Sequence, residues 1–310
     1  MTDNKFSAVV SDSTLAMYHS NIRTIAKQVG VGADWIKNAD WLFAHRDKVF
    51  KMLEETPNIH TRKNRVSSLL WFAELHPTPA PIIFRLKSLQ MDCFSQLQKG
   101  YETQEKTEKQ EENWVTIEEI DIRLGVIKTL LELRAKDGRL WKPSEYTPIV
   151  QYLMLMFHRH LPLRNDLRLA KSISAEDYAD FDEPPTDHNW LIKDGDDWRL
   201  VLNKYKTEGT YGQKIIQIPR VVSDALTTYL PLDKWFYEKR DGTPVSTSQY
   251  TNTFNDIFKE YNKKVGSTQI RRTIISALHQ PKPHELKDKQ DLAFIMGHSV
   301  GTAQGVYAKI

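Results

Sequence analysis

The sequence is poor in several features that define large protein classes. Among its 310 residues there is a single cysteine, Cys93. One thiol cannot build a disulfide framework or a cysteine-rich zinc site, so we expect a reducing compartment. No apolar run approaches the roughly 18 residues of a membrane-spanning helix. The N-terminal stretch also lacks the charged-then-apolar order of a secretory signal peptide. We therefore expect an intracellular protein with no membrane association.

Excess charge is also nearly absent. The 43 Lys and Arg residues almost balance the 40 Asp and Glu residues, which leaves a net charge of +3. This weak excess permits a nucleic-acid partner without requiring one. The sequence shows neither a glycine-rich phosphate-binding loop nor a convincing carboxylate cluster, so we expect no nucleotide cofactor and no metal. The length allows two domains, each with its own core.

The first third of the chain is predicted to be helical. Apolar residues recur at steps of three or four in "STLAMYHSNIRTIAKQVG", and the same spacing returns in later segments. The cluster Arg62, Lys63 and Arg65 could contact DNA phosphates, or it could belong to ordinary solvated helix faces. The Glu-rich stretch "GYETQEKTEKQEENW" cannot bury a core, so we place a domain boundary there, between residues 105 and 106.

Helices also dominate residues 106–310. Thr116, followed by Glu119, is typical of a helix cap. A different period appears in "DWRLVLNKYKTEGTYGQKIIQIP", where two alternating segments flank a glycine-containing turn and predict a β-hairpin. The predicted fold is therefore mainly α with a small antiparallel β-sheet.

Polar residues of possible chemical importance are spread through this second half. They are Arg164 in "LPLRND", Lys206 in the hairpin, Arg271 beside Arg272 in "TQIRRT", and His298 and Tyr307 in "IMGHSVGTAQGVY". Each has an ordinary explanation by itself, such as helix capping, solvation or ring packing.

The order and spacing of these residues resemble the tyrosine recombinase, or phage integrase, family. The segment from Gly297 to Tyr307 carries most of the resemblance, and the Lys-Thr hairpin that ends in Ile-Pro is next. "LPLRND" and "ENWVTIEEI" are similar to segments of recombinases from viruses and mobile elements of eukaryotes. The resemblance implies a helical, SAM-like core-binding domain at residues 1–105 and a catalytic domain at residues 106–310. It also implies double-stranded DNA as the partner, a homotetramer on DNA, and action in a bacterial cytoplasm or nucleoid or in a eukaryotic nucleus.

The resemblance also assigns roles. Arg164 and Arg271 would hold the scissile phosphate, because guanidinium groups bind phosphate oxygens in bidentate fashion. Tyr307 would attack phosphorus and form a 3′-phosphotyrosyl bond. Lys206 would protonate the leaving 5′-oxygen, with Lys204 as its rival. His298 would hydrogen-bond the phosphate or assist proton transfer.

Two regions depart from the family pattern. A His or Lys usually lies three residues before the second arginine, but Thr268 occupies this position, or Gln269 if Arg272 is the catalytic arginine. Thr268 therefore remains a further candidate that can only hydrogen-bond.

The region of the first arginine also departs from the pattern, and it leaves a second candidate open. An acidic residue often follows it by three positions, where this chain has Leu167 with Asp166 beside it. Arg168 is a second candidate for the first arginine itself, although its place after "LPL" favours Arg164.

Three functions follow from these residues. The preferred hypothesis is a site-specific recombinase or integrase. A type IB topoisomerase-like enzyme would use the same residue types but reseal the same strand. A catalytically decayed, site-specific DNA-binding protein would lack the covalent step, and Thr268 favours it. Covalent chemistry at Tyr307 discriminates among them.

Overall fold

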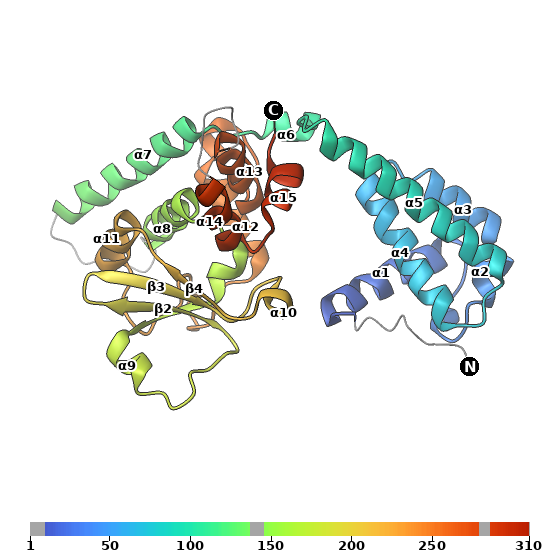
Figure 1. Cartoon of the computed structure of the whole chain (residues 1–310), viewed down its shortest axis with the longest axis horizontal. Helices are drawn as coiled ribbons and strands as arrows, with labels where there is room; N and C mark the ends of the chain where they lie inside the picture. The colour runs from blue at the N-terminus through green and yellow to red at the C-terminus, as the bar shows by residue number, and fades with distance from the viewer. Residues whose placement is uncertain (1–9, 137–145, 279–285, 310) are drawn as a thin grey trace. The chain divides into compact units, whose positions relative to one another are not determined.

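The computed structural model describes residues 10–136, 146–278 and 286–309. Contacts divide the chain into two compact units, Met1–Thr103 and Gln104–Ile310. The expected boundary, between residues 105 and 106, lies beside this division. Figure 1 shows helices in the described part of the first unit, and a second unit in which helices lie on both sides of a small sheet.

The described part of the first unit is helical, and two of its helices begin with a side-chain cap. Ser11 caps the first helix by accepting a hydrogen bond from the backbone of Thr14, and Asn58 caps α4 through Thr61 in the same way. The elements are α1 (Asp12–Gln28), η1 (Ala33–Ile36), α2 (Asp40–Ala44), α3 (Arg46–Glu54), α4 (Ile59–Leu75) and α5 (Ala80–Glu102).

The first unit has its own core. Ile22, Ile25 and Val29, which the helical spacing of α1 predicts to be on one face, are all buried. They join the inner faces of α3 and α4, including Phe50 and Phe72, in one hydrophobic cluster. The predicted helical unit is therefore a packed bundle rather than a set of solvated helices.

The second unit is longer and mixed. Its capping box at Thr116 and Glu119 is present, with hydrogen bonds in both directions, as the sequence predicts. Its helical elements are α6 (Glu108–Glu112), α7 (Ile117–Lys136), α8 (Tyr146–His160), η3 (Asn165–Leu169), α9 (Ala175–Ala179), α10 (Glu208–Tyr211), α11 (Arg220–Tyr229), α12 (Thr247–Ile257), η4 (Lys259–Tyr261), α13 (Ser267–Leu278), α14 (Leu286–Met296), α15 (Val300–Thr302) and the π-helical turn η5 (Ala303–Tyr307).

The sheet has the strand order β1-β2-β3-β4. The strands are β1 (Ala170–Ser174), β2 (Asn189–Asp194), β3 (Asp197–Leu202) and β4 (Lys214–Gln217). The predicted hairpin is the antiparallel pair β3–β4. The expected small sheet is present and two of its three strand pairings are antiparallel, but β1 pairs parallel with β2, so the sheet is mixed. A crossover through α9 joins these two strands, and such a connection returns the chain to the same end of the sheet.

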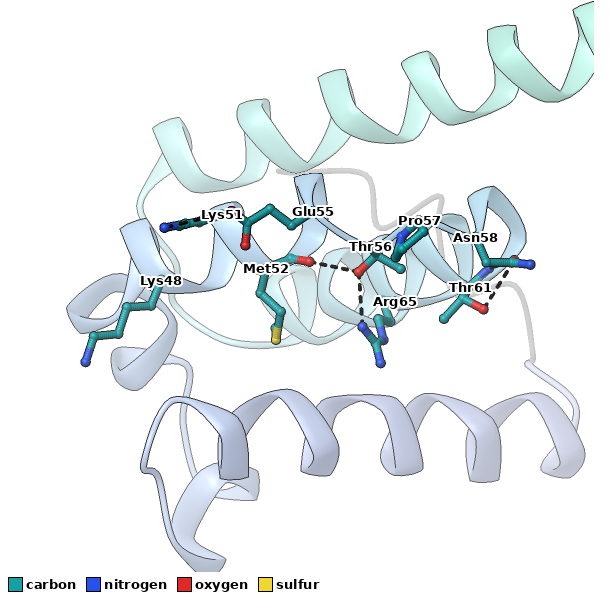
Figure 2. Close-up of a pocket in the computed structure, with 9 residues that line it drawn as sticks. All are labelled: Lys48, Lys51, Met52, Glu55, Thr56, Pro57, Asn58, Thr61 and Arg65. Atoms are coloured by element: carbon teal, nitrogen blue, oxygen red, sulfur yellow. Dashed lines mark hydrogen bonds and ion pairs between the residues drawn. The ribbon is translucent and has the colours of Figure 1, made fainter.

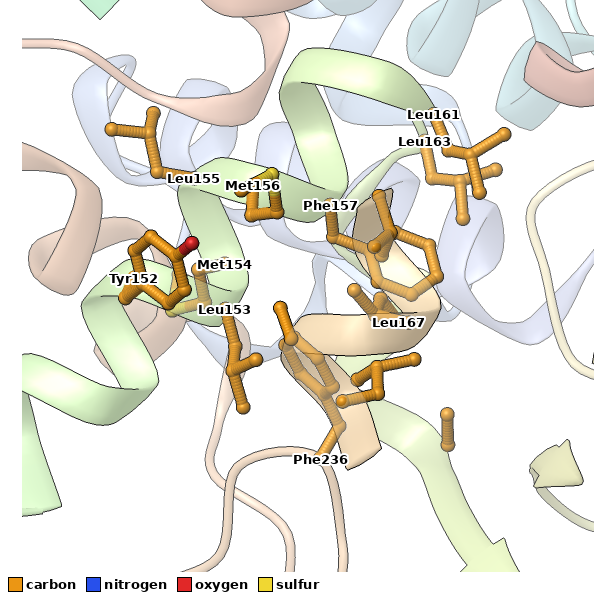
Figure 3. Packing of buried hydrophobic residues seen from close by; sticks show 14 of the residues in the cluster. Tyr152, Leu153, Met154, Leu155, Met156, Phe157, Leu161, Leu163, Leu167 and Phe236 are labelled. Atoms are coloured by element: carbon orange, nitrogen blue, oxygen red, sulfur yellow. The ribbon is translucent and has the colours of Figure 1, made fainter. Parts of the chain in front are cut away.

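The two faces of the sheet belong to different cores. On one face, Leu191 and Leu200 join the large cluster that includes α8, part of which Figure 3 shows around Phe157 and Phe236. On the other face, Ile192 and Val201 form a small cluster against α9. This alternation follows from the two-residue period of a strand. The large core fixes α8 and the segment after it, where the first candidate arginine lies.

None of the helices in the described ranges combines the length and apolar character needed to cross a membrane.

Candidate active site

Residues from distant parts of the second unit line one open cavity of about 370 Å³. It brings together Arg164, Lys206, Thr268, Arg271 and Tyr307 of the predicted set. Asn165, Asp166, Arg168, Thr247 and Ser267 complete the lining. His298 contacts both arginines directly, so every predicted site residue lies in or against this cavity.

Arg164 owes its position to the end of α8. Leu161 and Leu163 on either side of Pro162 are buried in the large core, and this anchors the backbone just before the arginine. One guanidinium nitrogen of Arg164 donates to the carbonyl of Met296 at 3.2 Å, and another lies 3.3 Å from the ring nitrogens of His298.

Arg168, the alternative first arginine, donates to the carbonyl of Val245 at 3.1 Å. Arg168 also lines the cavity, but Arg164 contacts His298, which favours Arg164 as the first arginine of the predicted set.

Arg271 is the most buried of the cations, with 1% of the side chain exposed. It lies on α13, and its Nη2 is 2.6 Å from Nε2 of His298. Burial lowers the pKa of Arg271, and the neighbouring Arg164 lowers it further. A fixed guanidinium in such a poorly hydrated place interacts strongly with an incoming anion.

His298 follows a tight turn at the end of α14. Gly297 has φ +66°, which favours glycine, and the backbone N–H of His298 donates to the carbonyl of Ala293 at 2.9 Å. Burial and then the charges of Arg164 and Arg271 lower the pKa of His298 to about 3. The imidazole is therefore neutral at neutral pH, with Nε2 accepting from an arginine.

Tyr307 is the last residue of the π-helical turn. The chain after it is held, because the backbone N–H of Lys309 donates to Ser276 Oγ at 2.8 Å. The Tyr307 ring lies 4.8 Å from the His298 ring and 4.7 Å from the Arg271 guanidinium carbon. Burial raises the pKa of Tyr307, but the charges and hydrogen bonds of Arg271 and Arg164 outweigh this, so the pKa lies below its ordinary value.

The structure distinguishes the two lysines of the hairpin connection. Lys206 lines the cavity, whereas Lys204 forms an ion pair with Glu208 at 3.2 Å. Lys206 therefore has the better position for proton transfer to a bound group.

Thr268 and Gln269, the two candidates for the position of the missing His or Lys, differ in their access to the cavity. Thr268 lines it with its side chain exposed, while Gln269 is buried in α13. Of the two arginines that follow, Arg271 is the one in contact with His298 and Tyr307.

Two residues near the site carried little sequence signal. Asp166 lines the cavity, whereas Leu167, at the position where an acidic residue was expected, is fully buried in the core. Burial raises the pKa of Asp166, and the nearby arginines only partly offset this. Lys214, the first residue of β4, is buried beside the end of α14. A lysine in a strand with alternating polarity gives no indication of such burial.

Neither a protein-family model nor a curated protein matches the chain. Solved structures do. The XerH site-specific recombinase, bound to a palindromic difH substrate in a post-cleavage complex, matches over 96% of this chain and 74% of that chain, with 12% identity and a TM-score of 0.51. The XerA recombinase matches over 97% and 89% with 15% identity, but a TM-score of 0.40 carries no weight.

The chain has the tyrosine-recombinase fold. Within this fold, the segment after α8, the β3–β4 connection, α13 and the two segments after α14 each supply at least one of the candidate residues. In chemical terms, two arginines surround a tyrosine hydroxyl of lowered pKa, and an exposed lysine opens onto the same space. Such a site suits an anionic electrophile that a tyrosine attacks. No cluster of three potential metal-ligating side chains occurs in the part of the chain that the structure describes.

Proposed function

We propose that the protein is a site-specific DNA recombinase or integrase that cleaves and rejoins strands through a covalent 3′-phosphotyrosyl intermediate. The observation that carries this proposal is the pair of guanidinium groups around the hydroxyl of Tyr307, which lower its pKa. The phenolate is the nucleophilic form, so this environment favours attack. Without such neighbours a tyrosine with a pKa of about 10 would be almost fully protonated at neutral pH.

The reaction is an exchange of one phosphodiester for another. Tyr307 Oη bonds to phosphorus while the bond from phosphorus to the 5′-oxygen breaks, and the phenolic proton leaves to a base. Water is the proposed acceptor of this proton, because the lone pair of neutral His298 already accepts from Arg271 and its lowered pKa makes it a weak base; His298 instead holds the arginines in place. Lys206 protonates the departing 5′-oxygen. Arg164 and Arg271 bind the non-bridging oxygens and stabilise the charge of the pentacoordinate transition state. Attack by a 5′-hydroxyl then reverses each step.

Double-stranded DNA is the proposed substrate. The XerH structure is described as a complex with its DNA substrate after cleavage, and the likeness of fold supports a DNA partner here. Strand exchange between two duplexes needs four cleavages, so we propose a homotetramer as the active assembly, in the cytoplasm or nucleoid of a bacterium or in a eukaryotic nucleus. Integration into a host, as by a virus or mobile element, is one use of this chemistry.

Covalent trapping tests the proposal. A library of labelled duplexes, each nicked beside a randomised position so that the cleaved end diffuses away, is incubated with the protein and denatured in SDS. We expect labelled DNA that migrates with the protein, and mass spectrometry of the digest should find the nucleotide on Tyr307. Tyr307→Phe should lose the adduct, whereas Tyr146→Phe, a change at an exposed tyrosine, should keep it.

The alternatives predict other results. Relaxation of supercoiled plasmid by a monomer, without exchange between duplexes, would favour the type IB topoisomerase-like enzyme. Specific binding with no adduct on any library member would favour the decayed DNA-binding protein, and would make Thr268 the first position to examine.

A further inference from the structure

Lys214 is a buried cation outside the cavity. Its side chain is 2% exposed, and its ammonium nitrogen lies 4.6 Å from the ring centroid of Phe294, 4.8 Å from that of Tyr211 and 5.2 Å from that of Tyr205. The same nitrogen donates to the carbonyl of Phe294 at 2.6 Å. None of the ion pairs found among the described residues includes Lys214. Three aromatic faces and one carbonyl therefore replace its water shell.

These contacts join two separate segments. Tyr205 and Tyr211 belong to the β3–β4 connection, residues 203–213, which carries Lys206. Phe294 belongs to the last turn of α14, directly before the Gly297-His298 turn. A cation at the C-terminal carbonyls of a helix is favourable in itself, because those carbonyls lack intrahelical partners.

A second contact joins the same two segments closer to the chemistry. Thr207 Oγ1 donates to the carbonyl of Gly297 at 3.3 Å. Thr207 directly follows Lys206, and Gly297 directly precedes His298. A Cβ at Gly297 would lie 2.7 Å from Thr207 Oγ1 and 3.5 Å from Lys214 Nζ, so the segments meet at a distance that only glycine permits.

We propose that Lys214 is a positioning residue that holds the connection carrying Lys206 against the end of α14. Lys206, the proposed general acid, and the segment that carries His298 then take fixed positions around one phosphate. The inference rests on the proposed function. Lys214 is not itself the acid, because its ammonium is bonded to Phe294 and does not line the cavity. Its loss should therefore impair protonation of the leaving group more than attack by Tyr307.

A change of leaving group separates these two effects. One nicked duplex carries the ordinary 5′-oxygen at the scissile phosphate, and a matched duplex carries a bridging 5′-sulfur. A thiolate is a much weaker base than an alkoxide and departs without a proton. Lys206→Ala should therefore slow cleavage of the oxygen substrate and not that of the sulfur substrate.

We expect Lys214→Met to slow cleavage of the oxygen substrate by roughly 10- to 100-fold, and cleavage of the sulfur substrate by less than about threefold. Thr207→Val, which removes only the hydroxyl, should give a smaller effect of the same selectivity. If Lys214→Met fails to fold, the Thr207→Val variant alone tests the proposal. Lys128→Met, at an exposed lysine of α7, is the matched control. Equal slowing of both substrates, or no slowing of either, by these variants would overturn the proposal.

Amide hydrogen exchange provides a readout that does not depend on catalysis. Lys214→Met and Thr207→Val should both increase exchange in residues 203–213 and in residues 294–299, while the rest of the sheet stays protected. If exchange rises in neither segment, the proposal that Lys214 holds the two segments together is wrong. If the wild type cleaves neither substrate but this exchange pattern appears, the proposed function has failed while the coupling between the two segments stands.

Discussion

Each unit contains a cavity with cations in its lining, and the two differ in what the cations contact. The first unit has a cavity of about 550 Å³ between α3 and α4, lined in part by Lys48, Lys51 and Arg65 (Figure 2). Lys48 and Lys51 are exposed, and Lys51 lies 3.8 Å from the carboxylate of Glu55. In the second unit, Arg164 and Arg271 form hydrogen bonds with neutral His298 and with the hydroxyl of Tyr307.

Under the proposed function, this difference assigns the first set of cations to the attraction of DNA and the second set to catalysis. Exposed lysines are free to move with solvent, and salt screens them, so they favour DNA binding at long range without fixing a phosphate. A buried guanidinium keeps its position, and its charge acts through a poorly polarisable surrounding. We therefore expect changes in the second cavity to reduce cleavage and changes in the first to reduce affinity.

The largest effect should come from Arg271→Lys. The ammonium keeps the positive charge but cannot form the two parallel hydrogen bonds of a guanidinium. We expect single-turnover adduct formation to fall by about 10²- to 10³-fold with DNA affinity changed little. Arg220→Lys, an exposed arginine paired with Asp224, is the control and should match the wild type. An Arg271→Lys protein that cleaves normally would remove the distinction between the two cavities.

Next in size is the acid sensitivity of the second unit. His158 is completely buried, and burial lowers its pKa to about 4. Since this folded value lies below the unfolded value of about 6.5, the unfolded state binds the proton more readily. The stabilisation is complete above pH 6.5 and is lost as the pH falls towards 4, by on the order of 3 kcal/mol.

Urea unfolding at pH 7 and at pH 4.5 tests this expectation. Hydrogen exchange in each experiment reports which segments unfold. The second unit should lose stability on acidification, and His158→Phe should reduce that loss. Equal loss in the wild type and the variant would assign the acid sensitivity to other groups.

A shift in the pH profile should be smaller. Because only the phenolate attacks, adduct formation should rise with pH, with a midpoint below the ordinary tyrosine value of about 10. Removing the cation in Arg271→Met should move that midpoint upward. A midpoint that stays in place would mean that Arg271 does not set the acidity of Tyr307.

The smallest effect should come from the first cavity. Lys48→Ala and Lys51→Ala should each weaken DNA binding a few-fold and reduce the slope of log affinity against log salt by about one. Fluorescence anisotropy over a salt series would measure both. Lys37→Ala, a lysine paired with Asp34 outside the cavity, is the comparison variant. Slopes that match the wild type would show that the first cavity does not contact phosphate.

The sequence predicted the parts of this protein that local rules govern. The buried face of α1, the Thr116 cap and the β3–β4 hairpin follow from periodicity and cap chemistry, and all are present. The parallel partner β1 was missed because "AKSIS" is a short strand whose pairing depends on a crossover. The candidate residues were found by their order along the chain, but their contacts were not. That Lys206 rather than Lys204 opens onto the cavity depends on the path of a connection that contains a helix.

The π-helical turn before Tyr307 has one further consequence. Such a turn spends one residue more on a revolution than an α-helix does. If these five residues were instead wound as an α-helix, with none removed, the extra residue would turn Tyr307 by about 100° from its present direction. The phenol would then face away from both guanidinium groups, although no side chain of the site had been altered. The backbone winding of Ala303–Tyr307, and not only the identity of the neighbouring side chains, therefore directs the phenol towards Arg164 and Arg271.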